Sequence, residues 1–112
     1  MQKILPGSPA TEHLEKHAQA AADLLKKMSN PHRLMILCTL AAGELSVTTL
    51  NQKVSLSQSA LSQHLASLRQ AELVQTRKDG QTVYYQLHGD AAIQVIAVLQ
   101  QIYCPDMSQK LP

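Results

Sequence analysis

Two helix-start signals lie so close together that they limit what this chain can fold into. Ser46 precedes a short segment with apolar residues at helical spacing that runs through Lys53, and Ser57 precedes a second segment that reaches about Ala71. Serine is favoured as an N-cap because its hydroxyl accepts a backbone N–H at the start of a helix. Only residues 54–56 separate the two helices, so they must cross steeply. The spacing predicts a helix-turn-helix.

Two further helices are expected before this pair. The first has a narrow apolar seam with charged residues between its members, which are Leu14, Ala18, Ala21, Leu25 and Met28. In the second, Asn30 can serve as N-cap and Pro31 suits the first helical position, where its missing N–H has no cost. That helix runs to Gly43, and residues 34–38 are apolar on every side, so we expect it to be the buried central helix.

After the helix-turn-helix the pattern changes from helical spacing to alternation. The segments 74–78 and 82–87 read as two strands, and the dipeptide Asp79–Gly80 between them is typical of a tight hairpin. Asp90 can then cap a last helix over residues 91–104, which is apolar on more than one face. Such a helix cannot bury itself on one small core, so we expect it to pack against a second subunit.

Together these segments predict a mainly α (α+β) fold, a winged helix-turn-helix of five helices and a two-stranded hairpin wing. The length of 112 residues suits one domain over 1–112, with an ordered core of about 10–104. Phe and Trp are missing, so the core must be built from Leu, Val, Ile and Ala. A homodimer through the first and last helices would supply the remaining core.

Several classes of protein are excluded or disfavoured. No apolar run is long enough to span a bilayer and no export signal is present, so we expect a cytoplasmic protein without a membrane partner. Two cysteines are too few and too far apart for a secreted disulfide framework or a zinc ribbon. A Cys-x-x-Cys motif, a Gly-rich phosphate loop and a convincing Ser/His/Asp set are all missing, so we expect no enzyme and no cofactor. A thiol oxidoreductase is the remote alternative.

The fourth predicted helix leaves a small polar face free, formed by Gln58, Ser59, Ser62 and Gln63. Gln can bond bidentately to adenine, and Ser can bond to several base edges in the major groove. These residues occupy the first turns of the helix, which is the part that enters the groove. The flanking residues expected to contact phosphates, directly or from the wing, are Lys53, Ser57, His64, Arg69, Arg77 and Lys78. A merely solvated helix surface is the alternative interpretation.

The net charge of +2 is small, but its distribution is uneven. Residues 53–80 carry four basic and two acidic side chains, a local net of +2, whereas residues 81–112 carry one basic and two acidic side chains, a net of −1. The positive charge therefore gathers around the polar face and the wing, as a specific DNA binder requires.

Three strings carry a resemblance to a known family: residues 30–34 (NPHRL), 56–65 (LSQSALSQHL) and 77–85 (RKDGQTVYY). They resemble the ArsR/SmtB family of dimeric bacterial winged-helix repressors, over roughly residues 14–104. The resemblance implies binding to a two-fold symmetric, double-stranded operator by a homodimer formed through the first and last helices.

The chain departs from both common metal-binding patterns of that family. Ser46, Val47 and Thr48 stand where one pattern places a cysteine pair, and Asp90 lacks the histidines that the other pattern needs. His13 and His17 are four residues apart and could chelate, but they lack further ligands nearby, so we predict no metal site. His32 and His64 are expected to pack between helices or to cap them.

The placement of Cys38 and Cys104 resembles the dithiol branch of the family, the HlyU, BigR and SqrR type, which answers peroxide or reactive sulfur. The resemblance implies that the pair oxidises within one subunit, to a disulfide or a bridge of extra sulfur atoms, and thereby lowers operator affinity. From the residues alone, buried cysteines in a cytosolic protein are usually inert. A regulator with structural cysteines that responds to a metal or to no ligand is therefore the alternative.

Overall fold

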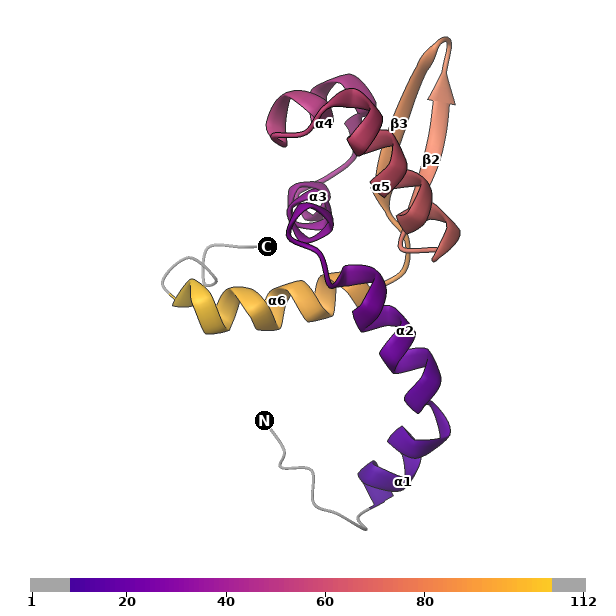
Figure 1. Ribbon diagram of the computed structural model, residues 1–112, viewed down its shortest axis with the longest axis vertical. Helices are drawn as coiled ribbons and strands as arrows, with labels where there is room; N and C mark the ends of the chain where they lie inside the picture. The colour runs from indigo at the N-terminus through magenta and orange to yellow at the C-terminus, as the bar shows by residue number, and fades with distance from the viewer. Residues whose placement is uncertain (1–8, 106–112) are drawn as a thin grey trace.

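The winged helix-turn-helix is confirmed by a computed structural model that describes residues 9–105 (Figure 1). The helices are α1 (Pro9–Lys16), α2 (Ala18–Met28), α3 (Pro31–Ala41), α4 (Val47–Lys53), α5 (Gln58–Gln70) and α6 (Ala91–Tyr103). The strands are β1 (Leu45–Ser46), β2 (Val74–Asp79) and β3 (Thr82–Leu87). The helices α4 and α5 form the helix-turn-helix, and the hairpin β2–β3 is the wing.

Two details differ from the prediction of five helices and two strands. The first predicted helix is divided at His17, whose backbone leaves helical geometry, so the described residues form six helices. Side chains 12–20 are all exposed, so no tertiary packing holds the two pieces in line. The second difference is the third strand β1, which at two residues is too short to produce a visible alternation.

Most of the predicted caps are confirmed. The Asn30 side chain accepts the backbone N–H groups of His32 and Arg33 at 2.9 and 3.1 Å, and Ser46 and Ser57 cap α4 and α5 through one N–H each. The prediction for Asp90 was wrong. Asp90 stands at the N-cap position of α6, but its backbone is already helical rather than extended and its carboxylate makes no capping bond.

The core is almost entirely aliphatic, as the composition predicts. Its buried members are Met28, Ile36, Leu37, Leu40, Leu50, Val54, Leu61, Leu65, Leu68, Leu73, Val74, Ala92 and Ile96. Helix α3 is central, packing against α2, α4, α5 and α6. It is not buried on every side as predicted, because Met35 is 57% exposed and Cys38 is only partly covered.

The central position of α3 leads to a prediction on stability. Leu37 is fully buried, and truncating such a side chain removes its burial and leaves a cavity, so Leu37→Ala should lower the free energy of unfolding by about 2 to 5 kcal/mol. The exposed Gln70→Ala should change it by less than about 0.5 kcal/mol. Urea unfolding at one fixed protein concentration compares them, and equal midpoints would contradict the assignment of the core.

The sheet has the order β1-β3-β2 and is antiparallel throughout. In the wing, Asp79 pairs with Thr82, which leaves Gly80 and Gln81 as a two-residue loop. Gly80 has φ +64°, the left-handed value that a tight hairpin needs at its first central position. The register places Arg77 opposite Tyr84, and Tyr84 opposite Ser46 of β1.

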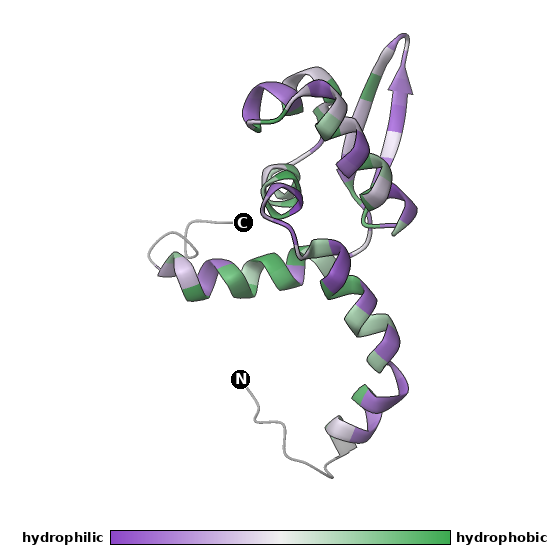
Figure 2. Cartoon of the chain, viewed as in Figure 1, coloured by the Kyte–Doolittle hydropathy of each residue, from purple (hydrophilic) through white to green (hydrophobic). Residues whose placement is uncertain are grey.

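The terminal helices extend away from this core as two arms (Figure 1). The radius of gyration is 15.8 Å, against about 13 Å expected for a compact chain of this length. Apolar residues remain exposed on both arms, and α6 is hydrophobic along most of its length (Figure 2). They are Leu14 and Leu25 on the first arm, which α1 and α2 form, and Ile93, Val98, Ile102 and Tyr103 on α6.

Within residues 9–105, no helix has the length and apolar character needed to cross a bilayer.

Candidate functional site

Helix α5 presents two opposite faces. Leu61, Leu65 and Leu68 are buried in the core. The four predicted base-reading side chains, Gln58, Ser59, Ser62 and Gln63, are all exposed. The Ser57 cap that starts the helix accepts the N–H of Ala60 at 3.1 Å, so the polar face occupies the first two turns of a well-defined helix. The structure therefore brings together a polar surface of the size and position that major-groove reading needs.

The predicted phosphate-contacting residues lie on α4, on α5 itself and on the wing. Lys53 is the last residue of α4, Arg69 lies in the last turn of α5, and Lys78 lies near the tip of the wing, all of them exposed. Ser57 is also exposed at the start of α5, and its hydroxyl lies 3.4 Å from that of Ser59. His64 and Arg77 differ from these four because the side chain of each is bonded to a residue more than 30 positions away in the sequence.

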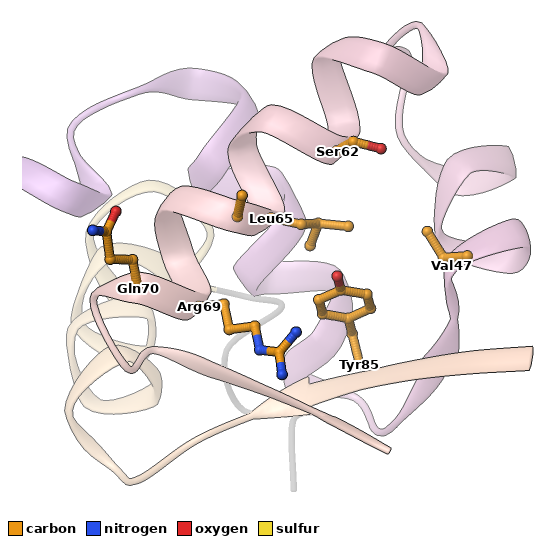
Figure 3. Close-up of a pocket in the computed structure, with 7 residues that line it drawn as sticks. Val47, Ser62, Leu65, Arg69, Gln70 and Tyr85 are labelled. Carbon is orange, nitrogen blue, oxygen red and sulfur yellow. The ribbon is translucent and has the colours of Figure 1, made fainter. Parts of the chain in front are cut away.

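A groove of about 480 Å³ runs between α5 and the strand β3 (Figure 3). Its apolar floor includes Leu65 and Val47, while Ser62, Arg69 and the ring of Tyr85 lie along it. Figure 3 shows Arg69 reaching beside Tyr85, and Gln70 also lines the groove. Ser62 and Arg69, predicted for bases and phosphates respectively, thus line one continuous channel between the helix and the wing.

His64 is tied to the start of α3, which agrees with the helix-packing role expected for it. Its Nδ1 accepts a hydrogen bond from Nε of Arg33 at 3.2 Å, and its ring lies 5.9 Å from that of His32, centroid to centroid. Burial and then the positive charges of Arg33 and His32 lower the pKa of His64 below its ordinary value of 6.5. His64 is therefore neutral at pH 7, with Nε2–H as its remaining donor.

The lowered pKa of His64 predicts a pH dependence of stability. Below pH 6.5 the unfolded chain takes up a proton at this position more readily than the folded chain, so stability must fall as the pH falls through the folded pKa. When the pH is lowered from neutral to mildly acidic, the melting temperature of the wild-type protein should fall further than that of His64→Gln. Gln keeps an acceptor for Arg33 but cannot titrate, so parallel melting curves for the two proteins would contradict the prediction.

Arg77 of the wing is held in an ion pair. Its Nη2 and Nε donate to the two carboxylate oxygens of Glu44 at 2.6 and 3.1 Å, and its guanidinium carbon lies 4.4 Å from the ring centroid of Tyr84. The pair raises the pKa of Arg77 and lowers the pKa of Glu44, in both cases chiefly through the hydrogen bonds between them. Arg77 is thus charged but already neutralised by a carboxylate.

The two cysteines lie on elements that pack together, Cys38 on α3 and Cys104 at the end of α6. Both are free thiols; Cys38 is partly buried and Cys104 is exposed. Burial raises the pKa of Cys38, and the charge of Cys104 raises it further. The fold thus brings together the helices that carry these two residues, although the residues are 66 positions apart in the sequence.

Sequence reasoning missed three residues that organise this surface: Arg33, Glu44 and Tyr84. The Asp79–Gly80 turn sets the register of the hairpin, so it could have indicated that Tyr84 faces Arg77. Nothing in the local pattern links Glu44 to the wing or Arg33 to α5, because both contacts arise only in the tertiary fold.

Within residues 9–105, no three His, Cys, Asp or Glu side chains gather where they could hold a metal ion.

Comparison with known proteins agrees with this geometry. Residues 30–76, from the cap of α3 into the wing, match the family model described as bacterial regulatory protein, arsR family. The chain is 48% identical over 101 residues to the transcriptional activator HlyU of Vibrio cholerae, a match that covers 89% of this chain and 94% of HlyU.

Two solved structures resemble it closely. The transcriptional repressor BigR from Xylella fastidiosa superimposes with a TM-score of 0.81 at 41% identity, covering 84% of this chain and 96% of BigR. Reduced HlyU from Vibrio cholerae gives a TM-score of 0.76 at 49% identity, covering 83% and 98% of the two chains. The chain therefore belongs to the ArsR family of winged-helix transcriptional regulators, in the branch that contains HlyU and BigR.

Proposed function

We propose that two copies of this chain bind a two-fold symmetric operator, each inserting the start of α5 into a major groove. The observation that carries the proposal is the exposed polar face of α5, opposite three buried leucines. Its readers are Gln58, Ser59, Ser62 and Gln63, whose amides and hydroxyls suit adenine and mixed base edges. The whole chain acts as one DNA-binding domain in the cytoplasm and needs no cofactor or catalytic group.

Phosphates on either side of the groove are contacted by Lys53, Ser57, His64, Arg69 and Lys78. These residues flank the polar face at the end of α4, along α5 and near the wing tip, so they can follow the backbone on both sides. The neutral His64 uses its Nε2–H as the donor. The sugar–phosphate backbone that borders the major groove of the DNA lies along the channel of the protein that Ser62 and Arg69 line.

The homodimer forms through the arms. Burying the exposed apolar residues of α2 and α6 against a second copy removes them from water, which is the main driving force for association. Dimerisation also sets the separation of the two recognition helices, which must match successive major grooves about 34 Å apart.

Operator affinity is lowered when Cys38 and Cys104 become linked within one subunit. The proposal is supported by the packing of α3, which carries Cys38, against α6, at whose end Cys104 lies, and by analogy with the Vibrio cholerae relative, whose structure is that of the reduced protein. Cys104 is exposed and reacts first, whereas Cys38 is partly buried with a raised pKa and acts as the resolving thiol.

With peroxide, the Cys104 thiolate attacks one oxygen, the O–O bond breaks, and a sulfenic acid and water form. Cys38 then attacks that sulfur and releases a second water, which leaves a disulfide. With a low-molecular-weight persulfide, Cys104 takes up the outer sulfur and releases a thiol. Cys38 displaces that sulfur as hydrogen sulfide to give the disulfide. If a second persulfide instead transfers its outer sulfur to Cys38 and releases a second thiol, the Cys38 persulfide attacks the inner sulfur of the Cys104 persulfide. Hydrogen sulfide leaves, and one extra sulfur bridges the two residues.

The linkage acts through α3, because α3 packs against both α5 and α6. Fixing α3 to the end of α6 connects the recognition helix α5 to the proposed dimer interface. The connection changes the tilt or the separation of the two recognition helices. A coupling of about 1 to 3 kcal/mol is enough to change affinity from about fivefold to a hundredfold.

Salt dependence and sequence preference test the two kinds of DNA contact. A duplex selected by the reduced wild-type protein from a random-sequence library, called the selected duplex below, is compared with a scrambled duplex. Lys53→Ala and Lys78→Ala should weaken binding to both duplexes and reduce the salt slope by about 0.9 for each phosphate contact removed. Gln63→Ala should weaken binding to the selected duplex by about 1 to 3 kcal/mol with an unchanged slope.

Gln70→Ala is the matched control, because Gln70 is an exposed glutamine at the opposite end of the same helix. Because Gln70 lines the groove beside Arg69 and lies outside the polar face, Gln70→Ala should leave the preference for the selected duplex over the scrambled duplex unchanged. Equal losses on both duplexes in Gln63→Ala would count against base reading by this face of α5. Failure of the wild-type protein to prefer any duplex would contradict the proposed function itself.

A further inference from the structure

The ion pair of Arg77 crosses the whole sheet. Glu44 lies 33 residues before Arg77 in the sequence, just ahead of β1, whereas Arg77 belongs to β2 at the far edge of the order β1-β3-β2. To reach Glu44, the Arg77 side chain lies over the ring of Tyr84 on the middle strand. We call the three residues Glu44, Tyr84 and Arg77 the wing clasp.

The wing clasp joins the wing to the start of the helix-turn-helix. Tyr84 pairs in register with Ser46, and the Ser46 hydroxyl caps α4 by accepting the N–H of Thr49. Glu44 is only two positions before Ser46. The outer strand of the wing is therefore connected, through one side chain, to the residues that fix where α4 begins.

The base of the wing is held by the core, because β3 packs against α3 and α4 and β2 packs against α5, whereas the outer part of the wing, residues 77–82, is exposed. The strand β1 has two residues, and a two-stranded hairpin is marginally stable by itself. A bidentate Arg–carboxylate pair adds geometric definition as well as attraction, since the planar guanidinium can satisfy both oxygens in one orientation only. The clasp thus supplies a directional restraint at the middle of the wing.

Resting on the proposed operator binding, we propose that Arg77 and Glu44 are positioning residues for DNA recognition. They hold the wing at the angle at which Lys78 near its tip meets the phosphate backbone. Lys78 supplies the charge, whereas the charge of Arg77 is offset by Glu44. This role differs from the direct phosphate contact expected for Arg77 from sequence.

The two roles make opposite predictions for Glu44. If Arg77 were a phosphate ligand, Glu44 would compete with DNA, and removing its charge would free Arg77 and tighten binding. If Arg77 positions the wing, removing the charge of Glu44 breaks the clasp and weakens binding. The weakening would occur although the protein becomes more positive, so general electrostatic attraction cannot produce it.

The test uses Glu44→Gln in the full-length protein, with Kd measured on the selected duplex over a series of salt concentrations. We expect binding about fivefold weaker than wild type, with a salt slope reduced by no more than in Lys78→Ala, because the phosphate contact that depends on the wing angle is that of Lys78. Arg77→Lys should show the same loss, because Lys keeps the charge but cannot form the bidentate pair. Thermal melting verifies that both variants fold, as expected for changes at an exposed and a half-buried side chain.

Asp79→Asn is the matched control, since it removes one negative charge from the same wing but keeps the hydrogen bonds between Arg77 and Glu44, and it should bind as tightly as wild type or more tightly. Equal or tighter binding by Glu44→Gln, or wild-type binding by Arg77→Lys, would overturn the proposal. If Lys78→Ala still lowers the salt slope in that case, operator binding stands and only the wing clasp fails. If no variant changes binding and no duplex is preferred, the proposed function fails instead.

Discussion

Val98→Asp on α6 is expected to give a monomer that binds the selected duplex at least a hundredfold more weakly than wild type. Val98 is 46% exposed in the single chain and is one of four large apolar side chains that α6 leaves exposed. In the proposed dimer a carboxylate at this position would be buried without a partner, which costs several kcal/mol. Each 1.4 kcal/mol changes an equilibrium about tenfold, so dimerisation would be lost at ordinary protein concentrations.

DNA binding depends on that dimer because the second half-site is held at a high effective concentration once the first is bound. Sedimentation of Val98→Asp should therefore show a monomer in the same samples in which the Kd for the selected duplex is raised. Gln94→Glu provides the control, since it adds the same charge at an exposed polar position of α6. A dimeric Val98→Asp with wild-type affinity would contradict the interface.

The wild-type protein offers a check that needs no variant. If the arms form the interface, its melting temperature should rise with protein concentration, because association stabilises only the folded chain. A melting temperature independent of concentration would indicate a stable monomer.

Oxidation of the dithiol is expected to weaken wild-type binding by about fivefold to a hundredfold. Cys38→Ser and Cys104→Ser should bind the selected duplex like reduced wild type, and treatment with peroxide or a persulfide should leave their affinity nearly unchanged. The reason is that neither variant can link α3 to α6, although both keep a residue of similar size at each position.

The order of reaction separates the two variants. Cys38→Ser should accumulate a sulfenic acid or persulfide on the exposed Cys104, whereas Cys104→Ser should react slowly because Cys38 is partly buried and its pKa is raised. Intact mass and peptide mapping identify the products. Unchanged wild-type affinity after verified linkage would contradict the switch, and a covalent bond between two subunits would contradict its intramolecular form.

Most of the fold could be predicted because its signals are local. The caps at Asn30, Ser46 and Ser57 depend on neighbouring residues, and the buried leucines of α5 follow directly from helical periodicity. The exposed polar face then follows as the opposite side of the same helix. Asp90 shows the limit of this reasoning, since the residue type was right for a cap but the backbone before α6 was not extended.

The rest of the site could not be predicted because it depends on contacts between distant segments. The bond from Arg33 to His64 and the pair of Arg77 with Glu44 join residues 31 and 33 positions apart. The partial exposure of Cys38 likewise depends on how α6 covers α3. The sequence shows which charges the wing carries, but only the fold shows which of them is already paired.

The central claim is that a symmetric dimer reads DNA with the polar face of α5, and hydroxyl-radical footprinting of reduced wild-type protein on the selected duplex tests it most directly. The account predicts two protected tracts related by two-fold symmetry, with centres about one helical turn apart, and loss of both tracts in Val98→Asp. A single tract, or uniform protection along the whole duplex, would contradict it.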